Sequence, residues 1–476
     1  MFGEEIWYWG ALFAIVEVWG LLAAFQALQQ GRSPQGTLAW TVSLVLIPTL
    51  SLPLYFLFGR DRFEGYAIAR RRGVEELNEL AKKVYSYGLM FRSEFGEDMT
   101  GVQTLEHLAR LRFTKENRVD LLVDGRATFD AIFDAFEKAE HYLLVQFYII
   151  HDDTIGREFK RRLIEQAARG VRVYFLYDEF GCLSLPQPYL DELCDAGIEV
   201  VRFETSRRTN RFQVNFRNHR KVVVADGKVA LLGGINVGDE YLGNDPTFGP
   251  WRDTHVAITG PAAQGVQLAF VEDWFWNTRA LPELEWEPAP APKSDTNVLI
   301  LPTGPADAFE ACELFFIHTI NTAKESIWIA TPYFVPSSEV IQALRLASLR
   351  GVRVRILLPE RPDQLLVYLS AFSYLQEIED FDIEIYRYQA GFLHHKAMLV
   401  DDCVVAMGTA NFDNRSFRLN FEITAVVVDR SFAAEVLAMF EADLADSRLA
   451  GLTDLNDRPW WFRLGVALAR LFSPIQ

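Results

Sequence analysis

The sequence repeats itself beyond residue 110. The apolar run YLLVQFYIIHDD at 142–153 and the run SIWIATPYFVPSS at 326–338 both read as strands, and each is followed by an amphipathic stretch that ends at glycine. Further along, VRVYFLYDE at 171–179 corresponds to VRVRILLPE at 352–360. Strands that alternate with helices indicate βαβ units around a largely buried sheet. We therefore predict an α/β fold built from two similar domains.

A proline-rich segment divides the two copies. The sequence LPELEWEPAPAPKSDT at 281–296 has the composition of a linker. It places the predicted domains at 111–280 and 297–446, and 476 residues are enough for both together with additional segments. The remaining tail, 447–476, contains WWF followed by the basic amphipathic run RLGVALARLF. Such a tail can lie in a membrane interface or pack on the body, and the sequence does not decide between them.

One dense signature occurs in each copy with identical spacing. The first copy contains His219-Arg220-Lys221, Asp226 and Gly233-Gly234-Ile235-Asn236, and the second contains His394-His395-Lys396, Asp401 and Gly408-Thr409-Ala410-Asn411. In both, four residues separate the lysine from the aspartate and six separate the aspartate from the glycine. A lone HxK triplet carries no information, but two complete copies in matching places of a repeat indicate a two-part site.

The spacing of each signature suits phosphate chemistry. Alternate residues of an extended chain share a face, so His219 and Lys221 should point the same way, as should His394 and Lys396. The glycines allow a close backbone approach beside each asparagine. Two copies facing one another would surround one phosphate with two histidines, two cations and two amides.

The pattern resembles that of the phospholipase D superfamily over the whole 111–446 body. Within that superfamily the chain is most similar to bacterial cardiolipin synthases, in its apolar N-terminal region, in TPYFVP at 331–336, in GFLHHK at 391–396 and in NFDNRSFRLNFE at 411–422. The resemblance implies two phospholipase D-type α/β sandwich domains packed face to face.

The resemblance also implies roles for the signature residues. One histidine attacks phosphorus and the other acts as general acid and base; the family's usual order assigns these roles to His219 and His394, although the sequence leaves the order open. The residues expected to hold the non-bridging phosphate oxygens are Lys221, Lys396, Asn236 and Asn411. Asp226 and Asp401 fit a structural role better. No metal and no other cofactor is expected.

A catalytic histidine needs an acidic partner on its second ring nitrogen. Aligning the strand FEITAVVV with the strand RDTHVAIT matches Glu422 with Asp253. We predict these two carboxylates as orienting acids, and the alternative is that both are ordinary carboxylates at strand ends.

Two apolar runs precede the body. Ile6 to Leu28 contains 23 residues with one charge, and Thr37 to Phe58 contains 22 residues with none. About 20 apolar residues cross a bilayer core, and the acidic start of the chain does not suit a signal peptide. Residues 1–58 are therefore predicted to form a two-helix transmembrane hairpin, with 59–110 as a juxtamembrane segment.

Charge sets the expected location and partners. Five arginines follow the second run (60, 62, 70, 71 and 72) and one lies between the runs (32), so the positive-inside rule predicts a multi-pass protein of the bacterial inner membrane with a cytoplasmic body. The net charge of -17 argues against nucleic acid as a partner. The arginines at 207, 208, 211, 217 and 220 are predicted to form a local anion-binding rim.

The expected reaction joins two phosphatidylglycerol molecules into cardiolipin and glycerol through a phosphohistidine. The expected partners are phosphatidylglycerol, other anionic phospholipids and the membrane, and a homo-oligomer stays open. The alternatives are a phospholipase D hydrolase, a transferase with another alcohol acceptor, a nuclease and an inactive scaffold. The intact motifs disfavour the last, and the acidic charge disfavours the nuclease.

Overall fold

The computed structural model of the chain describes residues 2–30, 34–59, 75–96, 101–204, 215–246 and 248–476. The arginines used for membrane orientation, at 32 and between 60 and 72, lie outside the described residues, as do those at 207, 208 and 211 of the predicted anion rim.

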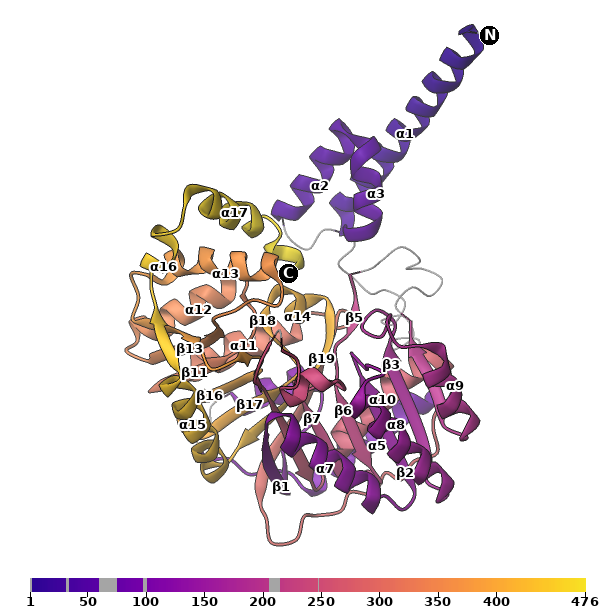
Figure 1. The fold of residues 1–476 in the computed structure, drawn as a ribbon, viewed down its shortest axis with the longest axis vertical. Helices are drawn as coiled ribbons and strands as arrows, with labels where there is room; N and C mark the ends of the chain where they lie inside the picture. The colour runs from indigo at the N-terminus through magenta and orange to yellow at the C-terminus, as the bar shows by residue number, and fades with distance from the viewer. Residues whose placement is uncertain (1, 31–33, 60–74, 97–100, 205–214, 247) are drawn as a thin grey trace.

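The centre of the body is one mixed sheet that contains strands from both halves (Figure 1). Its order is β20-β14-β13-β11-β16-β17-β19-β10-β1-β9-β7-β6-β2-β3-β4. The strands of the first half are β1 Thr114–Val123, β2 Tyr142–Phe147, β3 Arg172–Asp178, β4 Glu199–Phe203, β6 Val222–Ala225, β7 Val229–Gly233 and β9 Thr254–Thr259. Those of the second half are β10 Thr296–Thr303, β11 Ser326–Ala330, β13 Arg353–Pro359, β14 Ile383–Tyr388, β16 Ala397–Val400, β17 Val404–Gly408, β19 Asn420–Val428 and β20 Ser447–Ala450.

The two halves have the same internal order and meet edge to edge. In each half, three neighbouring strands are parallel to one another: β2, β3 and β4 in the first, and β11, β13 and β14 in the second. The strand pair that joins the two halves, β1 with β10, is antiparallel. The central pair, β1 with β10, starts at Thr114 opposite Val298 and contains a register shift. Corresponding strands of the two halves follow in the same order outward from this central pair. The signature-bearing strands β6–β7 and β16–β17 therefore lie at matching positions on either side of it.

Helices cover both faces of the sheet (Figure 1). Those of the first half are α5 Glu75–Met90, α6 Val102–Ala109, α7 Asp124–Lys138, α8 Thr154–Ala168, α9 Gln187–Asp195 and α10 Ala263–Thr278. Those of the second half are α11 Ala311–Thr322, α12 Ser338–Leu349, α13 Leu365–Ile378, α14 Asn414–Arg418, α15 Arg430–Ala445, α16 Thr453–Asn456 and α17 Trp460–Arg470. Helix α10 is buried over nearly its whole length, and Gly265 lets it approach Ile300 of β10. This helix therefore ties the first half to the second.

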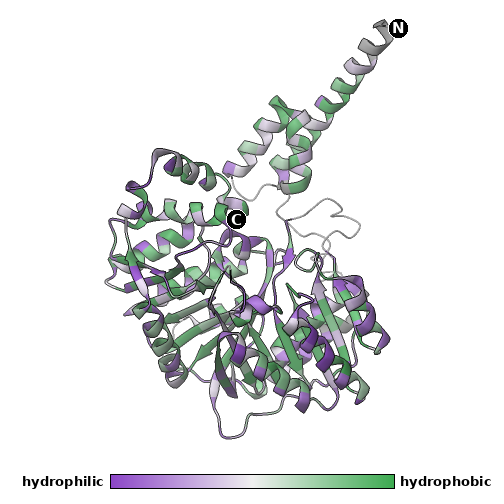
Figure 2. Cartoon of the chain, in the orientation of Figure 1, coloured by the Kyte–Doolittle hydropathy of each residue, from purple (hydrophilic) through white to green (hydrophobic). Residues whose placement is uncertain are grey.

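The N-terminal region differs from the predicted hairpin. Helix α1, Phe2–Gln30, contains one segment long and apolar enough to cross a membrane, Tyr8–Gln29. The second apolar run is two helices, α2 Pro34–Leu46 and α3 Pro48–Phe58, of 13 and 11 residues. At 1.5 Å per residue they are about 20 and 17 Å long, against a bilayer core of about 30 Å. Figure 2 shows hydrophobic residues along all three helices.

Helices α2 and α3 fold back on one another. The rings of Trp40 and Tyr55 are 5.3 Å apart, whereas a continuous helix would separate these positions by about 22 Å. The break falls at Ile47, whose φ of -139° and ψ of 58° are outside the helical region, directly before Pro48. Proline disfavours helical backbone at the preceding residue. The Ser51 hydroxyl lies 2.6 Å from the Ile47 carbonyl oxygen and 2.7 Å from that of Ser43, so it can donate to either acceptor at the turn. The predicted second span is therefore a short helical hairpin packed beside α1.

Candidate active site

The two signatures lie at corresponding strand entrances. In the first, β5 Arg217–Asn218 leads through His219, Arg220 and Lys221 into β6. In the second, β15 Phe392–Leu393 leads through His394, His395 and Lys396 into β16. All of these signature histidines and lysines are buried, and His219 is 9% exposed and His394 is 7% exposed.

Each histidine segment pairs with the other half of the molecule. Strand β5 lies parallel to the start of β19, and the His219 backbone N–H donates to the Phe421 carbonyl at 2.9 Å. Strand β15 lies parallel to β8 Trp251–Arg252, and the His394 N–H donates to the Arg252 carbonyl at 2.7 Å. The two signatures thus face one another across the molecule, and each is fixed by the acid-bearing strand of the opposite half.

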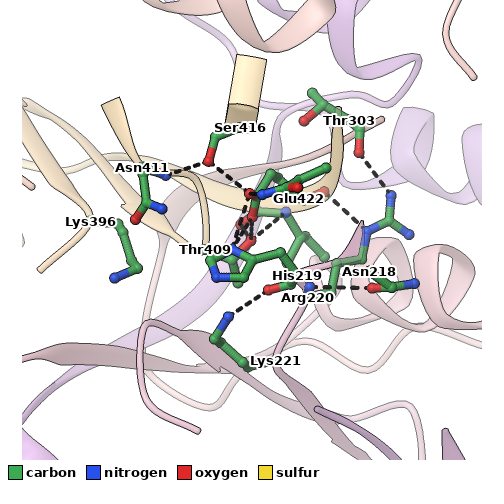
Figure 3. A network of polar contacts seen from close by, with 12 residues as sticks. Asn218, His219, Arg220, Lys221, Thr303, Lys396, Thr409, Asn411, Ser416 and Glu422 are labelled. Carbon is green, nitrogen blue, oxygen red and sulfur yellow. Dashed lines mark hydrogen bonds and ion pairs between the residues drawn. The ribbon is translucent and has the colours of Figure 1, made fainter. Parts of the chain in front are cut away.

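His219 contacts Glu422 of the second half (Figure 3). Its Nδ1 is 3.0 and 3.1 Å from the two carboxylate oxygens. The same carboxylate accepts hydrogen bonds from the Thr409 hydroxyl at 2.6 Å, the Ser416 hydroxyl at 2.9 Å and the Asn420 amide at 3.1 Å. With its oxygens held this way, Glu422 is oriented before any substrate binds, which in turn fixes the imidazole of His219.

His394 contacts Asp253 of the first half. Its Nδ1 is 2.7 Å from one carboxylate oxygen, and the other oxygen accepts from the Thr254 N–H at 2.7 Å. Gly234 leaves room for this carboxylate, because a Cβ there would lie 2.1 Å from Asp253 Oδ1. The corresponding position in the second signature is Thr409, which donates to Glu422 instead. Both predicted acids therefore contact a histidine, and the pairing crosses between the two halves.

The signature lysines lie beside the histidines. Lys221 Nζ donates to the His219 carbonyl oxygen at 2.7 Å, and Lys396 Nζ donates to the His394 carbonyl oxygen at 2.6 Å. Lys396 Nζ is also 2.9 Å from His394 Nδ1. The Nδ1 atom of His394 cannot donate to Asp253 and accept from Lys396 at the same time. We assign Nδ1 as protonated, with its N–H donating to the anionic Asp253 carboxylate. This tautomer leaves Nε2 of the imidazole with a free lone pair.

The signature aspartates stabilise the fold at the far ends of the strands. Asp226 accepts from the backbone N–H groups of residues 140, 141 and 142, and Asp401 accepts from those of residues 324, 325 and 326. Both have a φ of 51° in the turn that follows β6 or β16. Each thus fixes the start of the neighbouring strand, β2 or β11, which agrees with the structural role expected from the sequence.

The two asparagines differ in what they bind. The Asn236 carboxamide accepts from the Ile149 N–H at 3.1 Å and donates to the Tyr241 hydroxyl at 3.0 Å. Among the described residues, the buried Oδ1 of Asn411 has no hydrogen-bond partner. Because amide oxygen and nitrogen are interchangeable by a flip, the Asn411 side chain can present a donor to a ligand, whereas Asn236 has one amide hydrogen left for this purpose.

Burial and charge set the protonation states of the site. Burial lowers the pKa of His219 to about 4 and that of His394 to about 3, with the nearby lysine charges acting in the same direction. Burial also lowers the pKa of Lys221 to about 7 and that of Lys396 to about 8. Burial opposes ionisation of Glu422, but His219 and Lys221 hold its pKa below its usual value. At neutral pH the free enzyme therefore holds two neutral imidazoles, each beside a carboxylate.

These pKa values predict how stability depends on pH. Histidine has an ordinary pKa of 6.5, so His219 and His394 each bind a proton more tightly in the unfolded chain than in the folded protein. The stability contributed by the neutral histidines is complete above pH 6.5 and is lost as pH falls toward about 4, at up to about 1.4 kcal/mol per pH unit for each histidine. We expect the thermal unfolding midpoint of the detergent-purified chain to decrease as the pH is lowered from 6.5 toward about 4. The decrease should be less steep for His219→Gln. Equal slopes for both proteins would contradict the assignment.

Aromatic side chains line the site and were not singled out from the sequence. The Tyr148 ring lies 5.0 Å from His219 and that of Tyr333 lies 6.4 Å from His394. Trp251, 5.0 Å from His394, adds a third ring. The repeat held a signal for two of them, because Tyr148 and Tyr333 follow the corresponding strands β2 and β11. Burial raises the pKa of the Tyr148 phenol, so it remains a neutral hydrogen-bonding group.

The middle residue of each HxK triplet has a structural role, which corrects part of the predicted anion rim. Arg220 is 3% exposed and forms an ion pair with Asp273 of α10 at 2.9 Å, so it cannot line the mouth. Its counterpart His395 contacts Asp443 of α15 at 3.1 Å and points away from the site, since neighbouring residues of an extended chain face opposite ways. Arg217 is half-buried with its guanidinium 3.9 Å from the Phe180 ring.

Comparison with known proteins agrees with this geometry. A family model described as "Cardiolipin synthase, PLD-like domain" matches residues 132–247 and 316–444, and one described as "Phospholipase_D-nuclease N-terminal" matches residues 12–60. Cardiolipin synthase A of Pseudomonas fluorescens is 45% identical over 485 residues, covering 100% of this chain and 99% of the relative. The chain belongs to the cardiolipin synthase family.

Other members of the cardiolipin synthase family are equally similar, and a solved structure agrees on the fold. Cardiolipin synthase A of Pseudomonas aeruginosa is 45% identical, covering 98% of this chain and 96% of the relative. A crystal structure of phosphatidylserine synthase from Haemophilus influenzae superposes with a TM-score of 0.61 at 16% identity, covering 79% of this chain and 100% of that chain. This likeness shows that the phospholipase D-type α/β fold extends over the body.

The donor set of this cardiolipin synthase family member suits an anionic phosphodiester. Two buried lysines, Lys221 and Lys396, and the Asn411 amide lie beside two imidazoles. A phosphate anion bound there raises the pKa of both lysines, so that in their protonated form they can offset its charge without a bound metal ion. Among the described residues, no group of three or more histidine, cysteine, aspartate or glutamate side chains is placed to hold a metal ion. Metal independence stays a prediction.

Proposed function

We propose that this chain joins two phosphatidylglycerol molecules into cardiolipin and glycerol through a phosphohistidine. The observation that carries the proposal is the pair of crossed contacts, His219 with Glu422 and His394 with Asp253, which surround one site with two oriented imidazoles. One imidazole is needed as the nucleophile and the other as the proton carrier for the two alcohols.

In the first step, Nε2 of His219 attacks the phosphorus of one phosphatidylglycerol. The nitrogen–phosphorus bond forms while the phosphorus–oxygen bond to the glycerol headgroup breaks, and His394 gives its proton to the departing glycerol oxygen. His394 is neutral in the free enzyme. The bound phosphate charge raises the pKa of this histidine by offsetting its burial, so that it takes up the required proton from water. Lys221 and Lys396 stabilise the charge of the pentacovalent state.

In the second step, a glycerol hydroxyl of a second phosphatidylglycerol attacks the phosphohistidine. His394, now neutral, accepts the proton of that hydroxyl, the new phosphorus–oxygen bond forms and His219 is released. Water can resolve the same intermediate, so a transferase must exclude water and position the alcohol. The burial of both histidines and the apolar α1 helix, which tethers the body at the lipid surface, support alcohol as the acceptor.

Product analysis tests the reaction. The full chain is reconstituted in phosphatidylglycerol vesicles, and lipids and free glycerol are measured by mass spectrometry. We expect one glycerol released for each cardiolipin formed, with phosphatidic acid as a minor product. Mostly phosphatidic acid would assign the chain as a hydrolase. A serine or ethanolamine lipid, formed only when that alcohol is added and in preference to cardiolipin, would assign it to another transferase reaction.

Activity should survive removal of metal ions. The lysines and Asn411 already offset the phosphate charge, so we expect the cardiolipin formation rate to stay within about two-fold after exhaustive chelation with EDTA. The measurement uses vesicles prepared in chelated buffer, with magnesium added back as the control for effects on the lipids themselves. Complete loss that one divalent ion restores would contradict the proposed mechanism.

The body is proposed to lie on the cytoplasmic side of a bacterial inner membrane. The positive-inside rule supports this side, because five arginines between positions 60 and 72 follow the second apolar run in the sequence and precede the body. A multi-pass anchor would need the second apolar run to cross, but α2 and α3 are short and fold back on one another. We therefore propose that α1 crosses once, that α2 and α3 enter the membrane and return, and that the chain start lies outside.

Cysteine accessibility distinguishes these topologies. A re-entrant hairpin places Glu4 outside and Gln35 inside, whereas two full spans place Glu4 inside and Gln35 outside. In a chain that carries Cys194→Ser and Cys403→Ser, we expect an impermeant maleimide to label Glu4→Cys in intact spheroplasts and Gln35→Cys only after permeabilisation. The reverse pattern would restore the multi-pass hairpin. The absence of nucleic acid as a partner remains a prediction from charge, and self-association remains open.

A further inference from the structure

Helix α17 has two apolar faces, and only one of them packs on the protein. Phe462, Val466 and Ala469 face the body, where the Phe462 ring lies 5.3 Å from Phe372 of α13. At about 100° per residue these three positions fall within one narrow arc of the helix. Packing on α13 therefore accounts for this arc alone.

The second apolar face is exposed to solvent. It consists of Trp460 (69% exposed), Trp461 (62%), Leu464 (50%), Leu468 (52%), Leu471 (74%) and Phe472 (49%). At 3.6 residues per turn these six positions cover an arc of about 120° that does not overlap the packed face. Arg463, which is exposed, lies on the flank beyond this arc, and so does Arg470, which forms an ion pair with Glu377 of α13. A contiguous stripe of large apolar side chains on a surface marks an interaction site.

Helix α17 lies on the side of the body that carries the membrane anchor. Figure 1 shows α17 and the C-terminus on the side of the body nearest α1, α2 and α3. With α1 crossing the membrane as proposed above, the tethered body holds α17 close to the bilayer surface. Two adjacent tryptophans with arginines at the flank are typical of helices that lie in the headgroup region, where indole rings and arginine side chains contact both apolar and polar groups.

We propose that the exposed face of α17, defined by the six residues above, docks into the headgroup layer of an anionic bilayer. The anchor provides the tether, and α17 is a second, separate contact that sets how the body is tilted on the membrane. The occupant is lipid because the helix lies on the membrane-anchored side of the molecule and its apolar face is flanked by the exposed cationic side chain of Arg463.

The docked helix is connected to the active site by short hydrogen bonds. The residues that follow α17 hold α14: the Arg415 N–H donates to the Gln476 carbonyl at 2.6 Å, and the Asn414 amide donates to the Ser473 carbonyl at 3.1 Å. Helix α14 in turn carries Ser416, whose hydroxyl donates to Glu422 at 2.9 Å. Docking of α17 therefore orients the face of the body that carries the second signature relative to the lipid surface.

Lipid quenching of a fluorescent label tests the docking directly. Starting from a full chain with Cys194→Ser and Cys403→Ser, an environment-sensitive fluorophore is attached at Trp461→Cys or, as the matched control, at Arg463→Cys on the flank of the same helix. The proteins are reconstituted in phosphatidylglycerol–phosphatidylcholine vesicles with brominated acyl chains. We expect stronger quenching and a blue-shifted emission at 461 than at 463. Equal, weak quenching would overturn the proposal. A label at 461 protected from aqueous iodide but not quenched by lipid would assign the face to a second copy of the chain.

A kinetic measurement gives an independent result. Trp460→Ser combined with Trp461→Ser should raise the KM expressed as mole fraction of phosphatidylglycerol and leave kcat within about two-fold, because the chemistry is not touched. Leu183→Ser, which alters an exposed leucine (76%) of the first half, serves as the control and should change neither constant. An unchanged KM in the double variant would count against docking. Because quenching needs no turnover, it reports on docking even if the reaction proposed above is wrong.

Discussion

Replacing either signature histidine by alanine should abolish cardiolipin formation, with a loss of at least about 10⁴-fold in kcat. Without His219 there is no nitrogen to carry the phosphatidyl group, and without His394 neither glycerol oxygen has a proton carrier. The two variants should differ on a substrate whose leaving group needs no proton. With phosphatidyl-p-nitrophenol, His394→Ala should release about one equivalent of p-nitrophenol per enzyme, and His219→Ala should release none.

The same experiment settles which histidine is the nucleophile. A burst from His219→Ala and none from His394→Ala would reverse the two roles, and normal turnover in either variant would contradict the two-histidine site. Folding is checked by the thermal midpoint. His219→Ala leaves Glu422 with its bonds to Thr409, Ser416 and Asn420, whereas His394→Ala leaves Asp253 with the bond to Thr254. We therefore expect the second variant to be the less stable, by about 1–3 kcal/mol, and His394→Gln provides a milder substitute.

The repeat made the body predictable, and the anchor shows where such reasoning fails. Both halves could be located in the sequence because the two signatures have identical spacing. This spacing can be recognised without knowing how the two copies pack. The join between them, β1 with β10, was not predictable, since edge pairing depends on two strands far apart in the sequence. The break in the second apolar run had a local signal in Pro48, which counting apolar residues alone did not use.

The candidate site residues could be selected from the sequence, but the contacts between them could not. Alignment of the repeats identified Asp253 and Glu422, yet it compares equivalent positions and carries no information about contacts between the halves. The same limit explains Arg220, whose charge suggested a surface rim although its partner, Asp273, is buried in α10. Charge composition cannot distinguish an arginine that faces solvent from one that forms a buried ion pair.

The crossed pairing predicts a specific pattern of defects when the acids are neutralised. Glu422→Gln should slow phosphohistidine formation by about 10³- to 10⁴-fold, because a neutral amide can donate to Nδ1 of His219 and force the proton onto the attacking nitrogen. Asp253→Asn should affect His394 in the same way and reduce cardiolipin formation comparably. The sequence order alone would assign each acid to the histidine of its own half. In that case Glu422→Gln would impair His394, and Asp253→Asn would impair His219.

Phosphatidyl-p-nitrophenol separates the two assignments. Its leaving group needs no general acid, so Asp253→Asn should still give a burst of p-nitrophenol at nearly the wild-type rate, whereas Glu422→Gln should not. Thr409→Val, which removes one hydrogen bond to Glu422, should slow the burst by about ten-fold, and Glu435→Gln on the exposed face of α15 should leave it unchanged. A slow burst in Asp253→Asn with a normal one in Glu422→Gln would mean that each acid acts on its own half. Loss of the burst in both variants, with normal thermal midpoints, would mean that the two carboxylates act as one unit on the nucleophile.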